Sequence, residues 1–358
     1  MSTRADTARG ISRRQFLAAT ALITAAAQPA RSLAAPQTAG RIEIDGSDLV
    51  YGGQTLRLTG VAVGDSQYIR SHRPLSDYAT IAEDWRANCV RISVMPALWR
   101  QDAESAMAAL AENVAAARQL GLFVIIDWHA IGFPGYYEPT VPPDWGLPLD
   151  ANISSLAGAG AFWRAMATRF GGDPAILFEL WNEPVLDPKL WQATGQHWPV
   201  LKPAWEALIA EIRAHSDNIV LCAGGYWAHD LVGVKNNPIG DARTAYAWHA
   251  YPNAERGDLP ARIATLGGLQ TEKPIVVTEW GFCLDCQRDF AATIGDFAEP
   301  LATEVFDRFG LSHTAWCYSV GAMPNLLAED SGTPSPYGAF ARALLRQSAA
   351  DKRWMLSA

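Results

Sequence analysis

Short, nearly continuous apolar runs alternate along the chain with longer stretches of helical periodicity. The runs are rich in branched and aromatic residues, which is typical of strands that are buried on both faces. We expect eight strands: Leu58–Val63, Val90–Val94, Leu122–Asp127, Ile176–Trp181, Ile219–Cys222, Thr244–Trp248, Pro274–Thr278 and Thr314–Tyr318. Between them, segments such as Ala103–Leu120 and Pro203–His215 carry apolar residues at helical spacing.

Apolar strands that are separated by helices predict a parallel sheet covered by helices. Eight such units predict an α/β fold of the closed (β/α)8 TIM barrel type, with an open doubly wound sheet as the alternative. Ahead of the first unit, Arg41–Asp45 and Asp48–Tyr51 flank Gly46 and predict a hairpin that caps one end of the barrel. The chain is 49% hydrophobic, which is enough for a sizeable core, so we expect one domain over residues 36–358.

Polar residues cluster at the carboxyl ends of the expected strands. They are Arg91, Asp127, His129, Asn182, Glu183, His249, Tyr251, Glu279 and Trp316. In a TIM barrel these strand ends meet at one mouth, so residues far apart in the sequence are predicted to line a single cleft. Within this set we expect Asp127 either to orient a neighbouring side chain or to satisfy backbone groups at the barrel mouth.

Two of these residues, Glu183 and Glu279, suggest cleavage of a glycosidic bond. This reaction needs one carboxyl group to protonate the leaving oxygen and another to meet the oxocarbenium-like carbon. A lone glutamate such as Glu279 is often only a surface or salt-bridge residue. The segment Asn182-Glu183-Pro184 is more specific, because the proline ends the strand and the asparagine offers a partner to a sugar hydroxyl. An arginine such as Arg91 near Glu279 would favour the ionised form that a nucleophile needs.

In order, these residues resemble the functional positions of glycoside hydrolase family 5, the cellulase-like enzymes, over nearly the whole chain after residue 35. The resemblance implies a retaining mechanism with Glu183 as the acid/base and Glu279 as the nucleophile. It implies six substrate-binding or supporting residues: Arg91, which steadies the nucleophile, His129, Asn182, His249, Tyr251, which hydrogen-bonds the nucleophile, and Trp316, which lies beneath the cleaved sugar.

The resemblance also implies a β-linked polysaccharide or oligosaccharide as substrate, cleaved without a cofactor or a metal. We expect an endo-β-1,4-glucanase, while β-mannan, xylan and mixed-linkage glucan remain alternatives because loops decide between them. A non-catalytic carbohydrate-binding protein is the rival from another class, and it would typically lack one of the two glutamates. Some residues of the aromatic stretches Phe133–Trp145 and Trp191–Trp198, taken together with Trp227 and Trp280, are predicted to supply stacking surfaces, although each tryptophan by itself is more often a packing residue.

The first 35 residues predict a signal peptide rather than part of the fold. The segment Ser12–Leu17 contains Arg13-Arg14 and resembles a twin-arginine export signal. The apolar run that follows is shorter than the ~20 residues of a membrane span, although a retained anchor is an alternative. We therefore expect a periplasmic or secreted enzyme, off the membrane once the signal is removed.

Charge disfavours one class of partner. Residues 1–35 hold five arginines and one aspartate, so the rest of the chain has a net charge of −12. Nucleic-acid binding relies on clustered lysine and arginine, so we expect no nucleic-acid partner. As a separate expectation, the protein is a monomer.

The chain has five cysteines. Cys89, Cys222 and Cys317 lie in or beside apolar runs and are expected to be buried free thiols. Cys283 and Cys286 form a C-x-x-C motif without the second pair of ligands that a zinc site needs. A local disulfide and two free thiols are both compatible with this motif.

Overall fold

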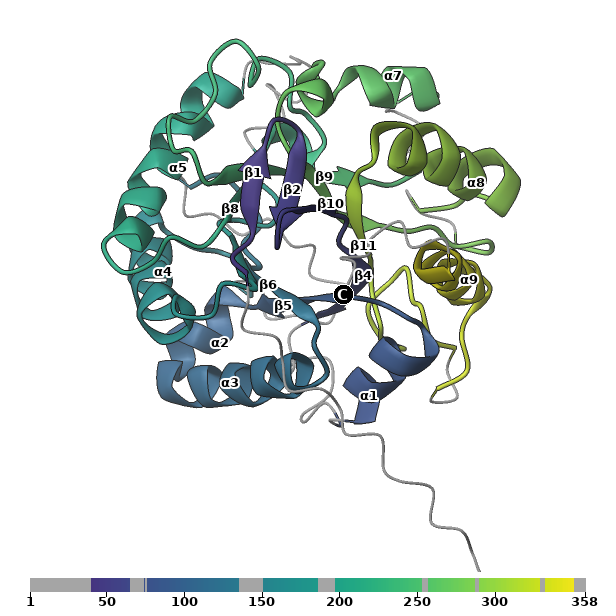
Figure 1. Ribbon diagram of the computed structural model, residues 1–358, viewed down its shortest axis with the longest axis horizontal. Coiled ribbons are helices and arrows are strands. Elements are labelled where there is room, and N and C mark those ends of the chain that lie inside the picture. The colour runs from purple at the N-terminus through teal and green to yellow at the C-terminus, as the bar shows by residue number, and fades with distance from the viewer. Residues whose placement is uncertain are drawn as a thin grey trace, which may run out of the picture. The chain divides into compact units, whose positions relative to one another are not determined.

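Residues 36–358 contain a closed barrel of parallel strands that is surrounded by helices (Figure 1). The computed structural model describes residues 40–64, 74, 76–134, 151–185, 197–252, 257–286, 290–328 and 332–350. The chain divides into two units, residues 1–35 and 36–358, and all described residues belong to the second. The barrel strands follow chain order from β4 to β11, and β11 pairs with β4 to close the barrel. The predicted (β/α)8 fold is confirmed.

All eight predicted strands overlap the strands of the barrel. Their bounds are β4 Thr59–Gly64, β5 Cys89–Val94, β6 Phe123–Trp128, β7 Ile176–Glu179, β8 Val220–Ala223, β9 Thr244–Ala250, β10 Ile275–Trp280 and β11 Ser312–Ala315. Every neighbouring pair is parallel. Their carboxyl ends therefore share one mouth of the barrel.

Helices and short helical segments lie between the strands. The α-helices are α1 Ser76–Ala79, α2 Pro96–Gln101, α3 Ala103–Gln119, α4 Leu156–Phe170, α5 Trp198–Arg213, α6 Gly225–Ala228, α7 Leu259–Ala264, α8 Glu299–Leu301 and α9 Pro336–Ala350. The remaining segments are η1 Thr80–Asp84, η5 Leu269–Thr271, η6 Ile294–Ala298 and η7 Ala302–Asp307. The two predicted helices correspond to α3 and α5. Within the described part of the chain, no helix combines the length and the apolar character needed to cross a membrane.

Side chains along each strand point alternately into the barrel and toward the helices, as the pleat of a strand requires. In β5, Val90, Ile92 and Val94 belong to the outer core beneath the helices. Cys89 instead packs with the residues that fill the barrel interior, and Arg91 follows it on the same face. The strands from β5 to β10 therefore contribute to both apolar cores.

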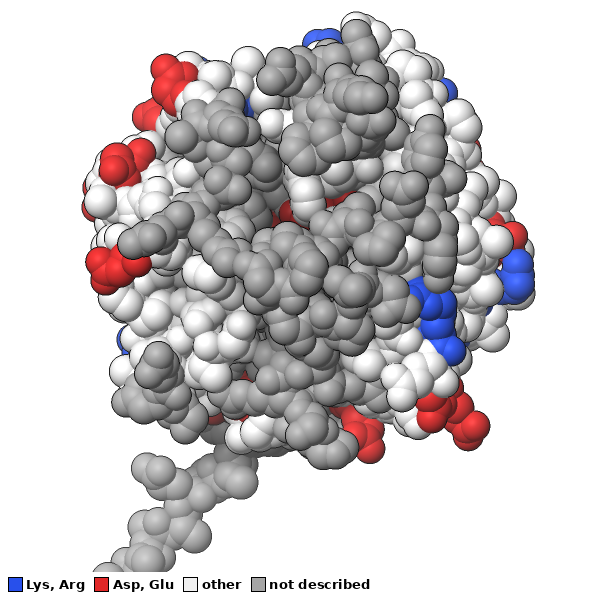
Figure 2. Space-filling view, turned by 180° about the vertical axis from the view of Figure 1, so that it is seen from behind, with Lys and Arg blue, Asp and Glu red and all other residues white. Residues whose placement is uncertain are grey.

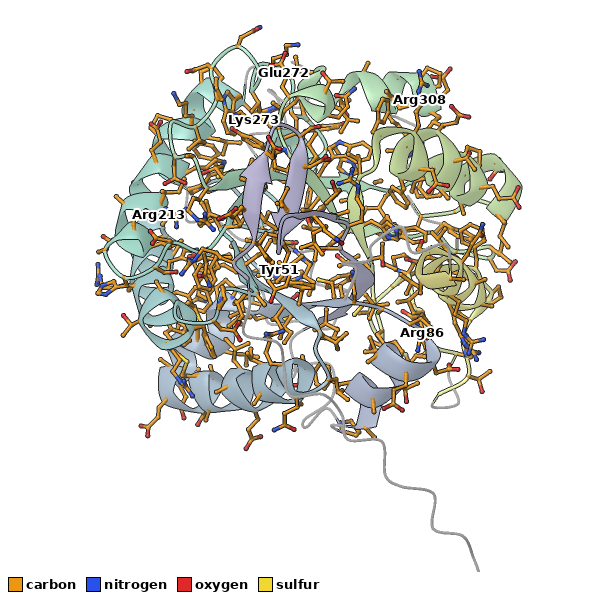
Figure 3. All side chains as sticks on the ribbon, viewed as in Figure 1. Tyr51, Arg86, Arg213, Glu272, Lys273 and Arg308 are labelled. Carbon is orange, nitrogen blue, oxygen red and sulfur yellow. A yellow bond between two sulfur atoms is a disulfide. The ribbon has the colours of Figure 1, made fainter. Side chains whose placement is uncertain are left out.

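A small antiparallel sheet covers the amino ends of the barrel strands. It consists of β1 Glu43–Asp45, β2 Asp48–Tyr51 and β3 Gln54–Leu56, so the predicted hairpin is present with one strand more than expected. Leu49 and Leu56 pack in the same apolar cluster as Leu177 from inside the barrel. Tyr51, labelled in Figure 3, meets the ring of Phe123 edge-on at 5.2 Å. This apolar seal leaves the carboxyl ends of the strands as the place for a polar site.

Candidate active site

Arg91 of β5 is fully buried and yet surrounded by acidic and polar groups. Its Nε donates to Glu179 Oε2 at 2.5 Å, and its Nη1 donates to Glu279 Oε1 at 2.8 Å. Its Nη2 donates to Asn182 Oδ1 at 2.7 Å and lies 3.0 Å from Asp127 Oδ2. Burial alone would lower the pKa of Arg91, but the nearby carboxylates outweigh burial and hold that pKa well above its usual value. Arg91 is therefore a permanent cation.

Strand register explains why the carboxylates gather around this arginine. Asp127 in β6 lies directly beside Glu179 in β7, and both point into the barrel. Ser93 of β5 pairs with Asp127, and Arg91 lies two residues nearer the amino end of the same strand. The long side chain of Arg91 extends up to the level of the two acids. Two adjacent buried carboxylates would repel each other strongly without such a cation.

A bulge in β10 directs Glu279 into the barrel. Val276 points inward and Val277 points outward, so strict alternation would turn Glu279 toward the helices. The register with β9 shifts between Val277 and Glu279, and Glu279 then pairs with His249. Bulges of this kind are known to redirect a side chain beside an active site.

Both carboxylate oxygens of Glu279 are held by hydrogen bonds. Oε1 accepts from Arg91, and Oε2 accepts from the hydroxyl of Tyr251 at 2.7 Å. Burial raises the pKa of Tyr251 well above its usual value, and the charge of Glu279 raises it further, so the phenol keeps its proton. Glu279, with a side chain only 5% exposed, is thus fixed as an oriented carboxylate.

Glu183 follows β7 and is held by the loop after β6. Its backbone N–H donates to the oxygen of Ala130 at 3.0 Å, and its own carbonyl accepts from Gly132 at 3.0 Å. Its side chain is 13% exposed, more than that of Glu279. On the face seen in Figure 2, acidic atoms are visible inside a hollow near the centre.

His249 of β9 connects the two glutamates. Its Nδ1 lies 3.0 Å from Glu183 Oε1 and 3.6 Å from Glu279 Oε2, and its Nε2 lies 3.2 Å from Thr278 Oγ1. Burial would lower the pKa of His249, but Glu279, Glu179 and Glu183 outweigh burial and raise it to about 10. His249 therefore carries a proton at neutral pH.

One wall of the mouth is formed by an imidazole and an indole. His129 Nδ1 lies 2.7 Å from Asp127 Oδ2, which is the orienting role expected of Asp127. The ring of Trp316 stacks on His129 with the ring centres 5.1 Å apart and an angle of 5° between the planes. The guanidinium carbon of Arg91 lies 5.9 Å from the centre of the Trp316 ring. Trp316 is only partly buried and so offers an apolar surface at the cleft.

All eight predicted site residues converge at this mouth, and the sequence prediction missed two that matter. Thr278 contacts His249, and Glu179 pairs with Arg91. Burial would raise the pKa of Glu179, but Arg91 outweighs burial and lowers it to about 2. The signal for Glu179 was an acid on the inward face of an otherwise apolar strand, two residues after Leu177.

The aromatic predictions have mixed outcomes. Trp280 belongs to the set in which some stacking surfaces were predicted, and the structure shows that it is a packing residue. The bulge turns Trp280 outward, where it is fully buried against Phe306 and Tyr337 at ring distances of 5.5 and 5.4 Å. Trp227 is partly exposed. Its backbone N–H donates to the backbone oxygen of Pro184 at 3.2 Å, and Pro184 follows Glu183 directly. Most of the stretches 133–145 and 191–198 lie outside the described residues.

Glu183, His249 and Glu279 form a cluster of residue types that could hold a metal ion. One potential ligand atom from each residue lies within 4.8 Å of the other two, and among the described residues this is the cluster with such spacing. However, both oxygens of Glu279 already accept hydrogen bonds, and the cationic guanidinium of Arg91 touches one of them. These contacts fit an acid–base pair better than a cation site.

Similarity to known proteins agrees with this geometry. The sequence model of the family described as Cellulase (glycosyl hydrolase family 5) matches residues 51–321. Endoglucanase N of Pectobacterium atrosepticum is 27% identical over 249 residues, which cover 68% of this chain and 50% of the relative. Cellulase CelDZ1 of Thermoanaerobacterium sp is 25% identical over 262 residues, which cover 69% of this chain and 63% of the relative. The chain thus matches about half to two thirds of the length of these relatives.

Solved structures share the fold over most of the chain. The native form of a β-glucanase from Saccharophagus degradans has a TM-score of 0.76 at 25% identity and covers 88% of this chain and 95% of that one. The same enzyme in complex with cellotetraose has a TM-score of 0.77 at 24% identity. The catalytic domain of Thermobifida fusca endoglucanase Cel5A has a TM-score of 0.68 at 21% identity, covering 86% and 98% of the two chains.

Replacing Glu179 with glutamine tests whether this carboxylate stabilises the buried cluster. Removing one partner of a buried ion pair typically costs about 3–5 kcal/mol, so we expect the free energy of unfolding at pH 7 to fall by that amount. The pKa of Glu179 is lowered from its ordinary 4.5 to about 2. Its stabilisation is therefore complete above pH 4.5 and is lost as the pH falls toward 2. Urea unfolding at a series of pH values measures both effects.

The matched control is Glu211→Gln, because Glu211 is a largely exposed acid paired with Arg164 at 2.8 Å. An exposed pair of this kind contributes at most about 1 kcal/mol. Equal stability of the Glu179 variant and the wild type at pH 7 would contradict the assigned role of Glu179. A stability difference that does not shrink at low pH would contradict it as well.

Proposed function

Because the chain belongs to glycosyl hydrolase family 5, the cellulase family, we propose that it is a retaining endo-β-glucanase acting on β-1,4-linked glucan. The observation that carries this proposal is the closeness of Glu183 and Glu279, which present carboxylate oxygens within 4.8 Å of each other. Retaining glycosidases place their carboxyl groups about 5–5.5 Å apart, whereas inverting ones need about 6.5–9.5 Å to admit a water molecule. The spacing supports direct attack by a carboxylate.

In the first step, Glu279 attacks the anomeric carbon while Glu183 protonates the leaving glycosidic oxygen. The C–O bond to the leaving sugar breaks, and an ester forms between the sugar and Glu279. Arg91 and Tyr251 hold the attacking carboxylate in place through hydrogen bonds to its two oxygens. In the second step, Glu183 takes a proton from water, and the resulting hydroxide attacks the anomeric carbon and releases Glu279.

His249 assists the proton transfers of this cycle. Its pKa is raised to about 10, so it keeps a proton at neutral pH, and its Nδ1 lies 3.0 Å from Oε1 of Glu183, which is the more exposed of the two side chains. A proton can therefore pass from His249 to Glu183 and on to the glycosidic oxygen. After this transfer, His249 lies 3.0 Å from the Glu183 carboxylate and stabilises the base that the second step needs.

The choice of glucan rests on the relatives and on the aromatic surfaces of the cleft. The curated relatives are called endoglucanases and cellulases, and the Saccharophagus enzyme is a β-glucanase solved with cellotetraose. Trp316 and Trp227 present partly exposed rings on the catalytic side, where pyranose rings can stack. Mannan, xylan and mixed-linkage glucan remain the competing substrates. A non-catalytic binding protein is disfavoured because both carboxylates are present and oriented.

A substrate panel tests the polysaccharide directly. We expect the protein to release short oligosaccharides from soluble β-1,4-glucan early in the reaction, because an endo-acting enzyme cuts within a chain. The products are sized by chromatography alongside parallel digests of mannan, xylan and mixed-linkage glucan, with Glu279→Gln as the inactive control. Release from mannan or xylan but not from glucan would overturn the substrate choice. An absence of release from every polymer would contradict the proposed activity.

Replacing each glutamate with alanine separates their roles. Glu279→Ala should lower kcat/KM by about 10⁴-fold or more on every substrate, the scale expected when a catalytic nucleophile is removed. Added azide should restore turnover and give the inverted glycosyl azide. Glu183→Ala should still form the covalent intermediate from an aryl glycoside with a good leaving group, because such a substrate needs little acid assistance. Azide should then give the azide of retained configuration, identified by NMR.

The control for this pair is Glu206→Ala, a surface acid that pairs with Lys202 and should leave activity near the wild-type level. Azide products of the same configuration from both variants would show that the two roles are wrongly assigned. Wild-type products of inverted configuration at early times would exclude the retaining mechanism itself.

We also propose that the enzyme is exported to the periplasm or outside the cell, on the basis of the Arg13-Arg14 motif. Residues 1–35 lie outside the described residues. Replacing Arg13 and Arg14 with lysine should trap the precursor in the cytoplasm, as measured by immunoblotting of cell fractions. The matched control replaces Arg4 and Arg9 with lysine, which should leave export intact. Normal export of the Arg13/Arg14 variant would mean that this pair is not the export signal.

A further inference from the structure

Tyr251 is held at three points. Its hydroxyl donates to Glu279 Oε2 at 2.7 Å, and its backbone oxygen accepts a hydrogen bond from Arg262 Nη1. Its ring meets the ring of Phe290 edge-on, with the ring centres 5.0 Å apart and an angle of 69° between the planes. The first contact fixes the nucleophile, the second fixes the backbone, and the third restrains the tilt of the phenol ring.

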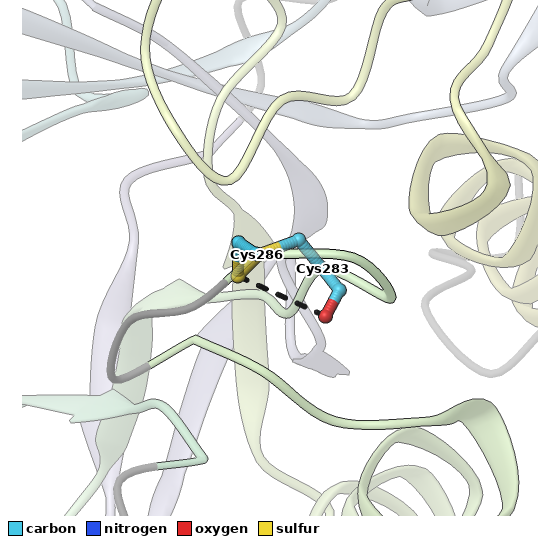
Figure 4. Close-up of a disulfide and its surroundings, with 2 residues drawn as sticks. All are labelled: Cys283 and Cys286. Atoms are coloured by element: carbon cyan, nitrogen blue, oxygen red, sulfur yellow. Dashed lines mark hydrogen bonds between the residues drawn. A yellow bond between two sulfur atoms is a disulfide. The ribbon is translucent and has the colours of Figure 1, made fainter.

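Phe290 lies in the segment after β10 that also carries the C-x-x-C motif. Cys283 and Cys286 form a disulfide with their Cα atoms 5.7 Å apart, which decides between the two alternatives left open by the sequence (Figure 4). The N–H of Cys283 donates to the oxygen of Phe290 at 2.8 Å, and the N–H of Ala292 donates to the oxygen of Cys283 at 3.1 Å. One residue thus belongs to the disulfide and also anchors the backbone on which Phe290 sits.

We propose that Phe290 is a positioning residue for the nucleophile: its ring holds the Tyr251 hydroxyl against Glu279, and the Cys283–Cys286 disulfide keeps Phe290 in place. This inference rests on the proposed retaining function, in which Glu279 attacks the sugar. The chain of contacts is continuous, from the disulfide through the Cys283–Phe290 hydrogen bond and the Phe290–Tyr251 ring contact to the carboxylate. The C-x-x-C motif, which lies outside the proposed catalytic residues, thereby affects catalysis.

The geometry explains why Tyr251 needs this support. A phenol can swing about its Cα–Cβ bond, and a small swing displaces the hydroxyl at the far end of the ring and lengthens its hydrogen bond. His229 and His249 lie near the same ring, but their centres are 6.2 and 6.5 Å away, farther than that of Phe290. Phe290 is therefore the nearest of these three rings.

The test measures Phe290→Ala on an aryl cellobioside with a good leaving group, where formation of the covalent intermediate reports on the nucleophile. An edge-to-face aromatic pair contributes enough to change a rate by about 2- to 13-fold, so kcat/KM should fall by that factor. The fall should come from kcat, with KM little changed. Phe290→Tyr, which keeps the ring, should restore the wild-type rate. Circular dichroism and urea unfolding verify that each variant is folded.

A double-mutant cycle with Tyr251→Phe shows whether Phe290 acts through the tyrosine hydroxyl. In the Tyr251→Phe background the hydroxyl is gone, so Phe290→Ala should change kcat/KM by less than about 2-fold. An undiminished effect in that background would overturn the proposal. A rise in KM on long substrates, with kcat unchanged, would make Phe290 a sugar contact and overturn the proposal too.

The disulfide is tested by the paired change Cys283→Ser and Cys286→Ser. We expect a loss of kcat in the same direction as for Phe290→Ala but smaller, and no further loss when the two changes are combined. The matched control is Leu284→Ala, because Leu284 lies between the two cysteines and is 45% exposed. Fully additive losses would overturn the link between the disulfide and Phe290. An inactive wild type would instead refute the proposed function, so the two failures are distinguishable.

Discussion

The ion pairs of Arg91 inside the barrel are the interaction on which the rest of the site depends. Asp127 and Glu179 lie side by side on adjacent strands, and Glu279 reaches the same space from β10. A planar guanidinium has donors that point in several directions, so it can contact all three acids and Asn182 at once. A lysine has its donors at one point and could not make these contacts together. The geometry of the proposed nucleophile, Glu279, therefore follows from one side chain of β5.

The interior of the barrel is apolar at one end of its axis and charged at the other. Toward the amino ends of the strands, the interior is apolar and is sealed by the small antiparallel sheet. Toward the carboxyl ends, the same inward-facing positions hold charged groups whose desolvation opposes folding. The large outer core beneath the helices offsets this cost. A rigid barrel wall in turn fixes the distances that the two-step reaction requires.

The sequence predicted the barrel and the eight site residues because strand ends and apolar runs are local signals. Glu179 was missed because an acid inside an apolar run is informative only once the inward face of the strand is known. The packing role of Trp280 could not be read from the sequence, because a bulge reverses the alternation of β10 and local composition does not reveal a bulge. The same bulge points Glu279 into the barrel. The pairing of the C-x-x-C cysteines depended on backbone geometry that spacing alone leaves open.

The account's central claim is that Glu279 forms a covalent bond to the sugar while Glu183 acts as acid and base. The most direct measurement is to trap this intermediate with a 2-deoxy-2-fluoro cellobioside that carries a good leaving group. Mass spectrometry of the intact protein should show one added fluorinated disaccharide, and peptide mapping should locate it on Glu279. An adduct on Glu183, or an active enzyme that never forms an adduct, would contradict the account.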